Sequence, residues 1–204
     1  MWFKRNFDSI GVTQFKPGPY LEAVQANFGG SVVLCLDVSG SMSGDPLRQA
    51  IQGCERFIEE AKENHYSVGL VLWHHDIDEK VKIGASYRSI QKVLRSAQAS
   101  GGNNICPTLS YAHSCLRDFP VVSDRVVAIF GDGDLGNPGE ATKAAAPLVA
   151  DNIRIITCGL GDQSASALDV ISTESRDSAR KADLSSLADD VAQMASALIS
   201  KKTP

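Results

Sequence analysis

Apolar stretches that alternate with amphipathic stretches constrain the fold of this chain most strongly. The first apolar run, SVVLCLD at residues 31–37, is nearly unbroken, which is typical of a strand covered on both faces. Three later runs also predict strands, and the second of them reads as buried: SVGLVLW at 67–73, RVVAIFGDGD at 125–134 and NIRIITCG at 152–159. The chain is therefore expected to build its core around a sheet.

Apolar residues at helical spacing fill the intervals between these strands. The dipeptide Asp45-Pro46 is read as an N-cap followed by proline in the first turn, and residues 47–61 then present one apolar face. Asn137-Pro138 repeats this start signal, and we expect Pro147 to kink or break the helix that runs on to about residue 150. Further helices are expected at 86–99, 108–117, 164–174 and 184–200.

Two short segments predict the edges of the sheet. EKVKI at 79–83 alternates polar and apolar residues, which suits an edge strand paired as a hairpin, and a second edge strand is expected near 178–182. Regular alternation of strands and helices predicts an α/β fold, an open and mostly parallel sheet with helices on both faces. Ligands of such sheets bind beyond the carboxyl ends of the strands, so Asp37 and Asp132 are expected at one end of the sheet.

Residues 1–30 differ from the rest of the chain. The segments KPGPY at 16–20 and NFGG at 27–30 interrupt a stretch of weak periodicity. We interpret 1–30 as a lead-in that packs on the domain or contacts a partner, and 31–204 as the domain. Trp2, Phe3 and Phe7 would form an amphipathic tip or, as we favour, pack in the core.

The composition argues against some classes of partner and location. The net charge is −4 and the basic residues are scattered, which argues against a nucleic-acid partner. No secretory signal and no run of transmembrane length are found, so we expect no membrane partner and a cytoplasmic location. The five cysteines show no CxxC spacing and are interpreted as buried small hydrophobes in a reducing compartment: Cys35, Cys54, Cys106, Cys115 and Cys158.

The end of the first strand carries a set of oxygen donors. Asp37, Ser39 and Ser41 alternate in one loop, and if that loop is extended their side chains converge on one point. A carboxylate and two hydroxyls form a hard, all-oxygen set of the kind that Mg²⁺ prefers. Asp132 can add a second carboxylate and Asn103 a side-chain carbonyl. The sequence therefore predicts a divalent-metal site of low negative charge that binds a further anionic oxygen from outside.

These segments resemble a known family. DVSGSMSG, SGGNNI and VVAIFGDG look like the three metal-site segments of the von Willebrand factor A domain family, over about residues 30–200. The resemblance implies a Rossmann-like fold with one antiparallel edge strand. It implies a non-enzymatic protein-interaction module in which Mg²⁺ or Mn²⁺, at a metal-ion-dependent adhesion site, is completed by a Glu or Asp of a protein partner. By the same analogy, the partner would belong to a multi-protein or AAA+ ATPase-linked assembly.

Two positions depart from the usual family pattern. Asn103 stands where the family has Thr, and Gly131 stands where the family has Thr before the aspartate of the third segment. Thr108 offers a hydroxyl nearby, but it comes five residues after position 103 and is expected in a helix. An alternative is therefore a degenerate scaffold of the same fold that binds partners without metal.

An enzymatic alternative is a phosphatase of the haloacid-dehalogenase type. These enzymes place a second aspartate where Ser39 stands here and a final aspartate where Gly136 stands, so the general acid would be missing. A serine hydrolase is weaker still, because Met42 occupies the nucleophile position of GSMSG.

The segment HHDID at 74–78 suggests a second metal site. If the strand stays extended, His74 and His75 point to opposite faces and do not share one ion, so we interpret the segment as a polar hairpin turn near the site face. Asp134 is interpreted as loop surface rather than an outer ligand.

Overall fold

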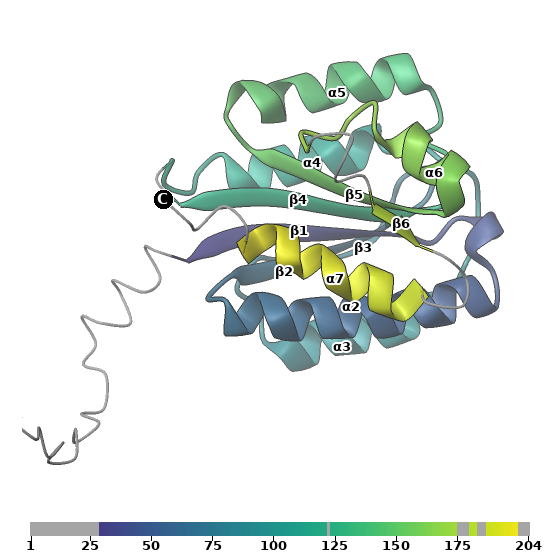
Figure 1. Ribbon diagram of the computed structural model, residues 1–204, viewed down its shortest axis with the longest axis horizontal. Helices are drawn as coiled ribbons and strands as arrows, with labels where there is room; N and C mark the ends of the chain where they lie inside the picture. Colours follow the sequence, from purple (N-terminus) through teal and green to yellow (C-terminus); the bar gives the residue numbers. More distant parts are fainter. Residues whose placement is uncertain (1–28, 122, 175–179, 183–186, 200–204) are drawn as a thin grey trace, which may run out of the picture.

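The computed structural model describes residues 29–121, 123–174, 180–182 and 187–199 (Figure 1). Its centre is a sheet in the order β3-β2-β1-β4-β5-β6. The strands are β1 (Gly30–Asp37), β2 (Ser67–Trp73), β3 (Ile77–Val81), β4 (Asp124–Gly131), β5 (Arg154–Leu160) and β6 (Arg180–Ala182). The helices are α2 (Asp45–Glu63), α3 (Tyr87–Ser96), α4 (Cys106–Leu116), α5 (Pro138–Ala150), α6 (Gly161–Leu168) and α7 (Leu187–Ile199), with a 3₁₀ turn η1 (Gly40–Met42).

The predicted α/β fold is confirmed. β1 pairs in parallel with β2 on one side and β4 on the other, β5 and β6 continue in parallel, and β3 is the antiparallel edge strand. The chain proceeds outward from β1 through β2 and β3, and then returns to the other side of β1 for β4. The strand order therefore reverses between β1 and β4, and the crevice at such a reversal is where open α/β sheets bind ligands.

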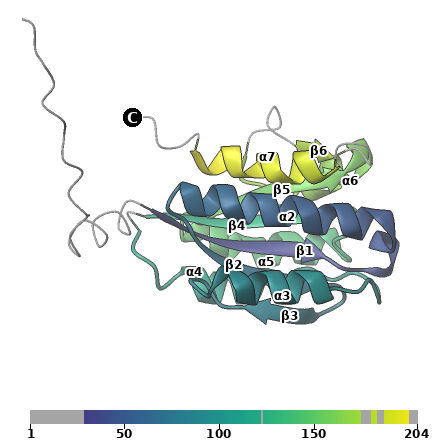
Figure 2. The same ribbon diagram turned by 90° about the horizontal axis from the view of Figure 1, so that it is seen from below.

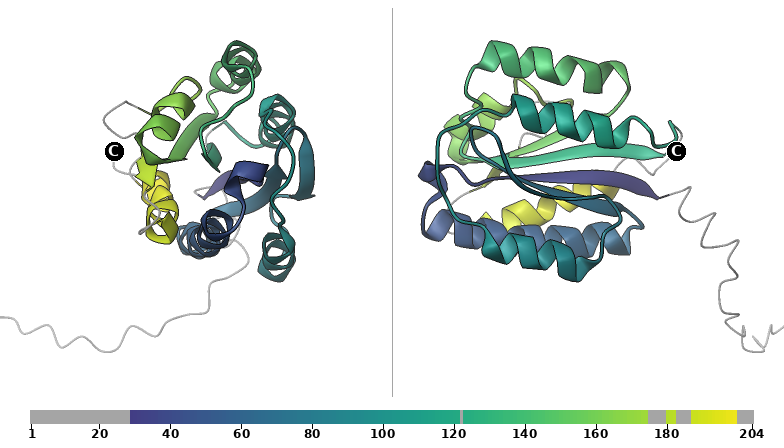
Figure 3. Two further views of the ribbon diagram at one scale, coloured as in Figure 1. Left: turned by 90° about the vertical axis from the view of Figure 1, so that its right-hand side faces the viewer. Right: turned by 180° about the vertical axis from the view of Figure 1, so that it is seen from behind.

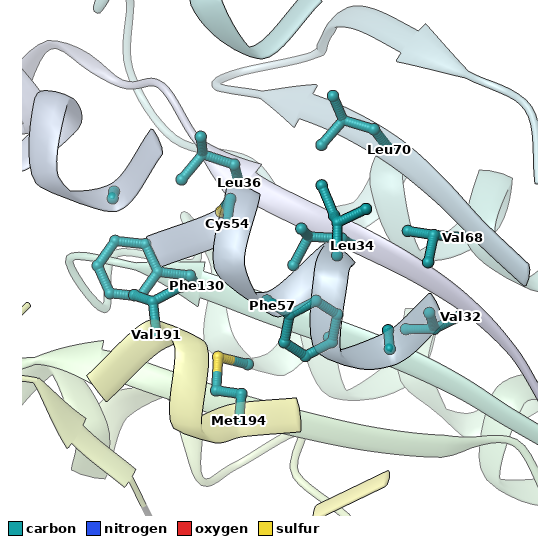
Figure 4. Packing of buried hydrophobic residues seen from close by; sticks show 14 of the residues in the cluster. Val32, Leu34, Leu36, Cys54, Phe57, Val68, Leu70, Phe130, Val191 and Met194 are labelled. Atoms are coloured by element: carbon teal, nitrogen blue, oxygen red, sulfur yellow. The ribbon is translucent and has the colours of Figure 1, made fainter. Parts of the chain in front are cut away.

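Helices cover both faces of the sheet, as the view along it shows (left panel of Figure 3). On one face, α2, α3 and α7 bury a core in which Phe57, Met194 and Leu34 lie together (Figure 4). On the other face, α4, α5 and α6 pack over a second cluster that includes Leu109, Leu148 and Leu168. α2 and α7 lie side by side (Figure 2). The central strands β1, β2, β4 and β5 are buried between these layers, which explains their almost unbroken apolar sequence, whereas the edge strand β3 is largely exposed.

Several predicted boundaries differ from the structure for identifiable reasons. α2 is capped by Gly44, at φ 87°, so Asp45 is the first helical residue rather than the cap. Asn137 caps α5 as predicted, and accepts a hydrogen bond from the backbone N–H of Glu140 at 3.1 Å. Of the two predicted effects of Pro147, the break does not occur, because α5 continues to Ala150. Pro147 is exposed, and so is Lys143, the residue whose carbonyl would accept the N–H that proline lacks.

The ends of other elements are set by contacts remote in sequence. α6 occupies 161–168 instead of 164–174, because the residues that follow it return to β5. The Ile155 N–H donates to the Thr173 hydroxyl at 2.8 Å, and the Thr173 N–H donates to the Ile155 carbonyl at 2.9 Å. The edge strand β3 begins two residues before the predicted 79–83, α3 ends at Ser96 and α4 begins at Cys106. The second edge strand is found at 180–182, and α7 begins at 187.

Three further predictions concern the amino-terminal segment, the cysteines and the membrane. The lead-in 1–30, with Trp2, Phe3 and Phe7, lies outside the described residues except for Gly29 and Gly30. All five cysteines are free thiols; Cys35, Cys54 and Cys158 are buried, and the other two are half-buried. Within the described ranges, no helix combines the length and apolar character needed to cross a bilayer.

Candidate metal centre

The carboxyl ends of β1 and β4 bring the first predicted residues together. β1 ends at Asp37, and Asp132 directly follows the last residue of β4. Because the two strands are neighbours in parallel register, the two aspartates lie at the same end of the sheet. The backbone N–H of Asp132 points at Asp37 Oδ2, at 3.4 Å. The strand reversal thus places two carboxylates side by side at the mouth of the crevice.

Asp37 is completely buried and is held by hydrogen bonds. Its Oδ1 accepts the backbone N–H of Ser39 at 2.8 Å, and its Oδ2 accepts the side-chain amide of Asn103 at 3.3 Å. Burial raises the pKa of Asp37 to about 7; hydrogen bonds from Ser39 oppose the shift and the negative charge of Asp132 adds to it. None of the ion pairs among the described residues involves Asp37 or Asp132.

The two serines reach the same point by a route that differs from the prediction. Residues 40–42 form the tight turn η1 rather than an extended loop. The turn still brings the hydroxyls together: Ser39 Oγ lies 3.0 Å from Ser41 Oγ, and the Ser41 hydroxyl donates a hydrogen bond to Asp132 Oδ2. Ser39 is buried and Ser41 is exposed, so the cluster opens to solvent on the Ser41 side. The buried side chain of Met42 anchors the turn in the core.

The Gly-rich loop 100–104 completes the arrangement. The Gly40 N–H donates to the Gly101 carbonyl at 3.1 Å, and the Ser100 N–H donates to the Val38 carbonyl at 2.8 Å. These bonds fix the loop against the β1 end and carry Asn103 to Asp37. All five predicted residues therefore meet at one end of the sheet. Asn103 faces Asp37 with its side-chain amide nitrogen.

Comparison with known proteins identifies the family. The family model for the von Willebrand factor type A domain matches residues 32–134, a stretch that contains all five clustered residues. The chain belongs to the von Willebrand factor type A (vWA) domain family. No curated protein matches the sequence.

Solved structures share the fold of this vWA domain. The vWF domain of the type V pili tip protein Mfa5 from Porphyromonas gingivalis superposes with a TM-score of 0.71 at 13% identity, covering 87% of this chain and 97% of that one. The hypothetical protein BatB from Bacteroides thetaiotaomicron gives 0.63 at 17% identity, covering 82% and 100%. The pilus adhesin SpaC from Lactobacillus rhamnosus GG gives 0.66 at 15% identity; the match covers 84% of this chain but only 30% of the adhesin. At these identities the likeness concerns the fold.

Some residues that shape the site of this vWA domain carry no signal in the sequence. The Ser164 hydroxyl, at the start of α6, donates to the Asp132 carbonyl and holds the β4–α5 loop. Leu135 is buried beneath that loop, and its carbonyl accepts the Ile105 N–H at 3.3 Å. A Cβ at Gly136 would lie 2.6 Å from the Asn103 carbonyl oxygen, so the loops approach closely only because position 136 is glycine. These contacts join segments far apart in the sequence.

The histidine pair His74 and His75 lies at the rim of the site. The two side chains do not point to opposite faces of a strand, as they would if β2 continued through them. β2 ends at Trp73, so His74 and His75 are not extended, and their rings stack with centroids 4.4 Å apart. The His74 carbonyl accepts the Asn104 N–H at 2.9 Å, which places the pair beside the Gly-rich loop. Across the described part of the chain, no group of three or more His, Cys, Asp and Glu residues is suited to hold a metal. A site here would have to use hydroxyl or amide oxygens as well.

The side chains of the other residues considered from the sequence, Thr108 and Asp134, do not join the cluster in the described contacts. Thr108 is in the first turn of α4, as expected, and is fully buried. Asp134 is exposed, and its Oδ1 accepts the Gly136 N–H at 2.8 Å, as expected for a loop residue. Ser39 occupies the position at which a phosphatase would need its general acid, and a hydroxyl there does not serve that role.

Proposed function

We propose that this vWA domain is a non-enzymatic protein-interaction module that binds Mg²⁺ or Mn²⁺ and through it engages an acidic residue of a protein partner. The proposed ligands, direct or through water, are Asp37, Ser39, Ser41, Asn103 and Asp132. The observation that carries the proposal is that Asp37 and Asp132 lie side by side at the strand ends, and that neither takes part in an ion pair among the described residues.

The chemistry of the cluster fits a hard divalent cation. Mg²⁺ takes about six oxygens and usually keeps several waters, so a few protein oxygens open to solvent on one side are sufficient. Burying Asp37 in its ionised form is costly, as its raised pKa indicates, and a cation would offset that cost. When bound, the ion supplies a positive centre that attracts a carboxylate from outside.

The residues around the cluster have separate tasks in this proposal. The Ser39 N–H orients Asp37 by holding Oδ1, which leaves Oδ2 directed toward Asn103 and Asp132. The Ser41 hydroxyl, which donates to Asp132, is the exposed member and marks the side from which a partner approaches. The hydrogen bond between Gly40 and Gly101 keeps the two ligand loops in register.

Calorimetric titration of the chelator-stripped protein with Mg²⁺ and Mn²⁺ tests the proposal. We expect saturable binding that Asp37→Ala abolishes and that Asp118→Ala, which removes an exposed carboxylate elsewhere, leaves unchanged. Binding that survives Asp37→Ala would place the metal elsewhere. A metal-dependent pull-down, repeated with chelator and with Asp37→Ala, then tests the acidic partner.

One observation favours a degenerate, metal-independent scaffold as the second candidate. Asn103 presents an N–H donor to Asp37, which already stabilises the carboxylate in part. In that case the natural protein binds no metal, whereas Asn103→Thr would create a measurable metal response. Metal binding by the natural protein through Asp37 would rule this candidate out.

The proposal also includes the cellular location of the module and the kind of assembly to which it belongs. By analogy with intracellular members of the family, we propose a cytoplasmic location and an AAA+ ATPase-linked or other multi-protein assembly, with neither nucleic acid nor membrane as partner. One neighbour is named as a pilus adhesin and another as a pilus tip protein, which supports an interaction role in general.

A further inference from the structure

A cavity of about 290 Å³ lies at the end of the sheet opposite the candidate metal centre. Its lining comes from the C-terminal half of α2, the start of β2 and the first turn of α3. The floor of the cavity consists of buried apolar side chains, and its rim consists of small or polar residues. The lining residues are Ile58, Lys62, Tyr66, Ser67, Val68, Gly84, Ala85, Ser86, Tyr87 and Ile90. We call it the α2–α3 pocket. An open apolar recess of this size accommodates one or two large side chains.

The chain enters the described structure beside this pocket. Gly30 begins β1, and a Cβ at that position would lie only 2.0 Å from a ring carbon of Tyr66, so the Tyr66 ring rests directly on the glycine. Tyr66 also lines the pocket. The next residue, Ser31, is in register with Ser67, another lining residue. Residues immediately before Gly29 are therefore within a few residues' reach of the pocket, since an extended chain spans about 3.3 Å per residue.

The sequence of 20–28, YLEAVQANF, is suited to such a recess. Leu21, Val24 and Phe28 recur at the spacing of one helix face, and the only charged residue is Glu22. Lys62 at the pocket rim forms none of the ion pairs found among the described residues, so the charges are complementary. The chain bends at Gly29, immediately before β1 begins at Gly30.

We propose that residues 20–28 dock in the α2–α3 pocket of their own chain, with the apolar face of Leu21, Val24 and Phe28 turned inward and Glu22 near Lys62. The tether favours this occupant over a separate molecule, because a segment joined by two residues has an effective concentration on the order of millimolar or higher. The segment then covers the apolar end of the α2–β2–α3 layer, and the metal-site end stays free.

Photo-cross-linking of the full-length chain tests where the segment binds. A photoreactive p-benzoyl-phenylalanine replaces Phe28, and cross-linked peptides are mapped by mass spectrometry. We expect cross-links within one molecule to residues 58–68 or 84–90. Cross-links to another face of the domain, to a second copy of the chain, or to no part of the protein would overturn the proposal.

Hydrogen exchange supplies a second measurement on the same full-length protein. Residues 20–28 should exchange at least about tenfold more slowly than an unstructured peptide. Ala85→Asp, which places a carboxylate at the pocket rim, should remove that protection, and so should Val24→Asp. The matched control is Ala146→Asp, at an exposed site on α5. Protection that survives Ala85→Asp, or exchange at the unprotected rate in the natural protein, would show that the pocket has no such occupant.

Discussion

The carboxylate of Asp37 occupies the space that a side chain at Gly131 would need. A Cβ at position 131 would lie 2.8 Å from Asp37 Oδ2 and 3.0 Å from Asp37 Cβ. Real Cβ atoms do not approach that closely, so any other residue at 131 displaces Asp37 or the end of β4. The glycine that departs from the family pattern is therefore matched to the position of the central carboxylate.

Gly131→Ala should weaken metal binding by about tenfold or more and destabilise the fold by about 1–3 kcal/mol, as overpacking does. Gly131→Thr, which restores the usual family residue, should weaken binding as well, because its Cβ meets the same carboxylate. Calorimetry and urea unfolding measure the two effects. Gly102→Ala is the matched control, since a Cβ there meets nothing within 4 Å. A gain of affinity in Gly131→Thr would contradict the steric argument.

The pKa of Asp37 predicts how stability depends on pH. The pKa is raised from 3.8 to about 7 by folding, so between these values the folded state holds a proton that the unfolded state has lost. The metal-free protein should therefore lose stability as the pH rises from 4 to 7, by an amount on the order of 4 kcal/mol, and level off above that. Urea unfolding in chelator from pH 5 to 8 should show this slope, and Asp37→Asn should flatten it.

Metal binding should show the opposite dependence on pH. The ion competes with the proton for Asp37, so the affinity for Mg²⁺ should rise about tenfold per pH unit below 7 and then level off. Calorimetry at pH 5.5, 6.5 and 8 measures this. An affinity that is constant over the range would mean that Asp37 is not a ligand or is already ionised.

Ser41→Ala should separate metal binding from stability. The substitution removes the hydroxyl that donates to Asp132, and Ser41 is exposed, so the free energy of unfolding should change by less than about 0.5 kcal/mol. The affinity for the ion should nevertheless fall, by about tenfold. Ser43→Ala, at an exposed position just after the same turn, should leave both unchanged. Equal affinities in the two variants would remove Ser41 from the proposed ligand set.

Tyr66→Phe should destabilise the domain at the other end of the sheet. The Tyr66 hydroxyl donates to Asp124 Oδ2 at 2.7 Å and lies 2.9 Å from the Leu198 carbonyl, which links β4 with α7. Loss of these bonds should cost about 1–2 kcal/mol in urea unfolding. Metal affinity should be unaffected, because the residue is remote from the cluster. Tyr87→Phe, whose hydroxyl bonds exposed Glu59, should cost less.

The sequence predicted the fold and the members of the cluster because both depend on local patterns. Apolar runs and helical spacing identified the strands and helices, and the rule that ligands collect at the carboxyl ends of parallel strands brought Asp37 and Asp132 together. Ser39 and Ser41 followed from their alternation, although the turn that unites them is a 3₁₀ turn.

Features that depend on distant contacts were not predictable. The end of α6 is set by Thr173 bonding to Ile155, and the close packing of Gly131 on Asp37 joins two strands. Which group of Asn103 faces Asp37 depends on the hydrogen-bond network of the assembled site. The exposure of Pro147, which lets α5 continue, follows only from how the helix packs.

The straight course of β1 has a practical consequence for handling the protein. The strand begins at Gly30 and ends at Asp37, so about 23 Å of extended chain separates the point where residues 1–28 attach from the buried carboxylate. A surface, a tag or a further protein joined directly before Gly29, in place of residues 1–28, would therefore lie at the far pole of the domain. Immobilised in that way, the molecule would present its cluster outward, with the approach of an acidic partner unobstructed.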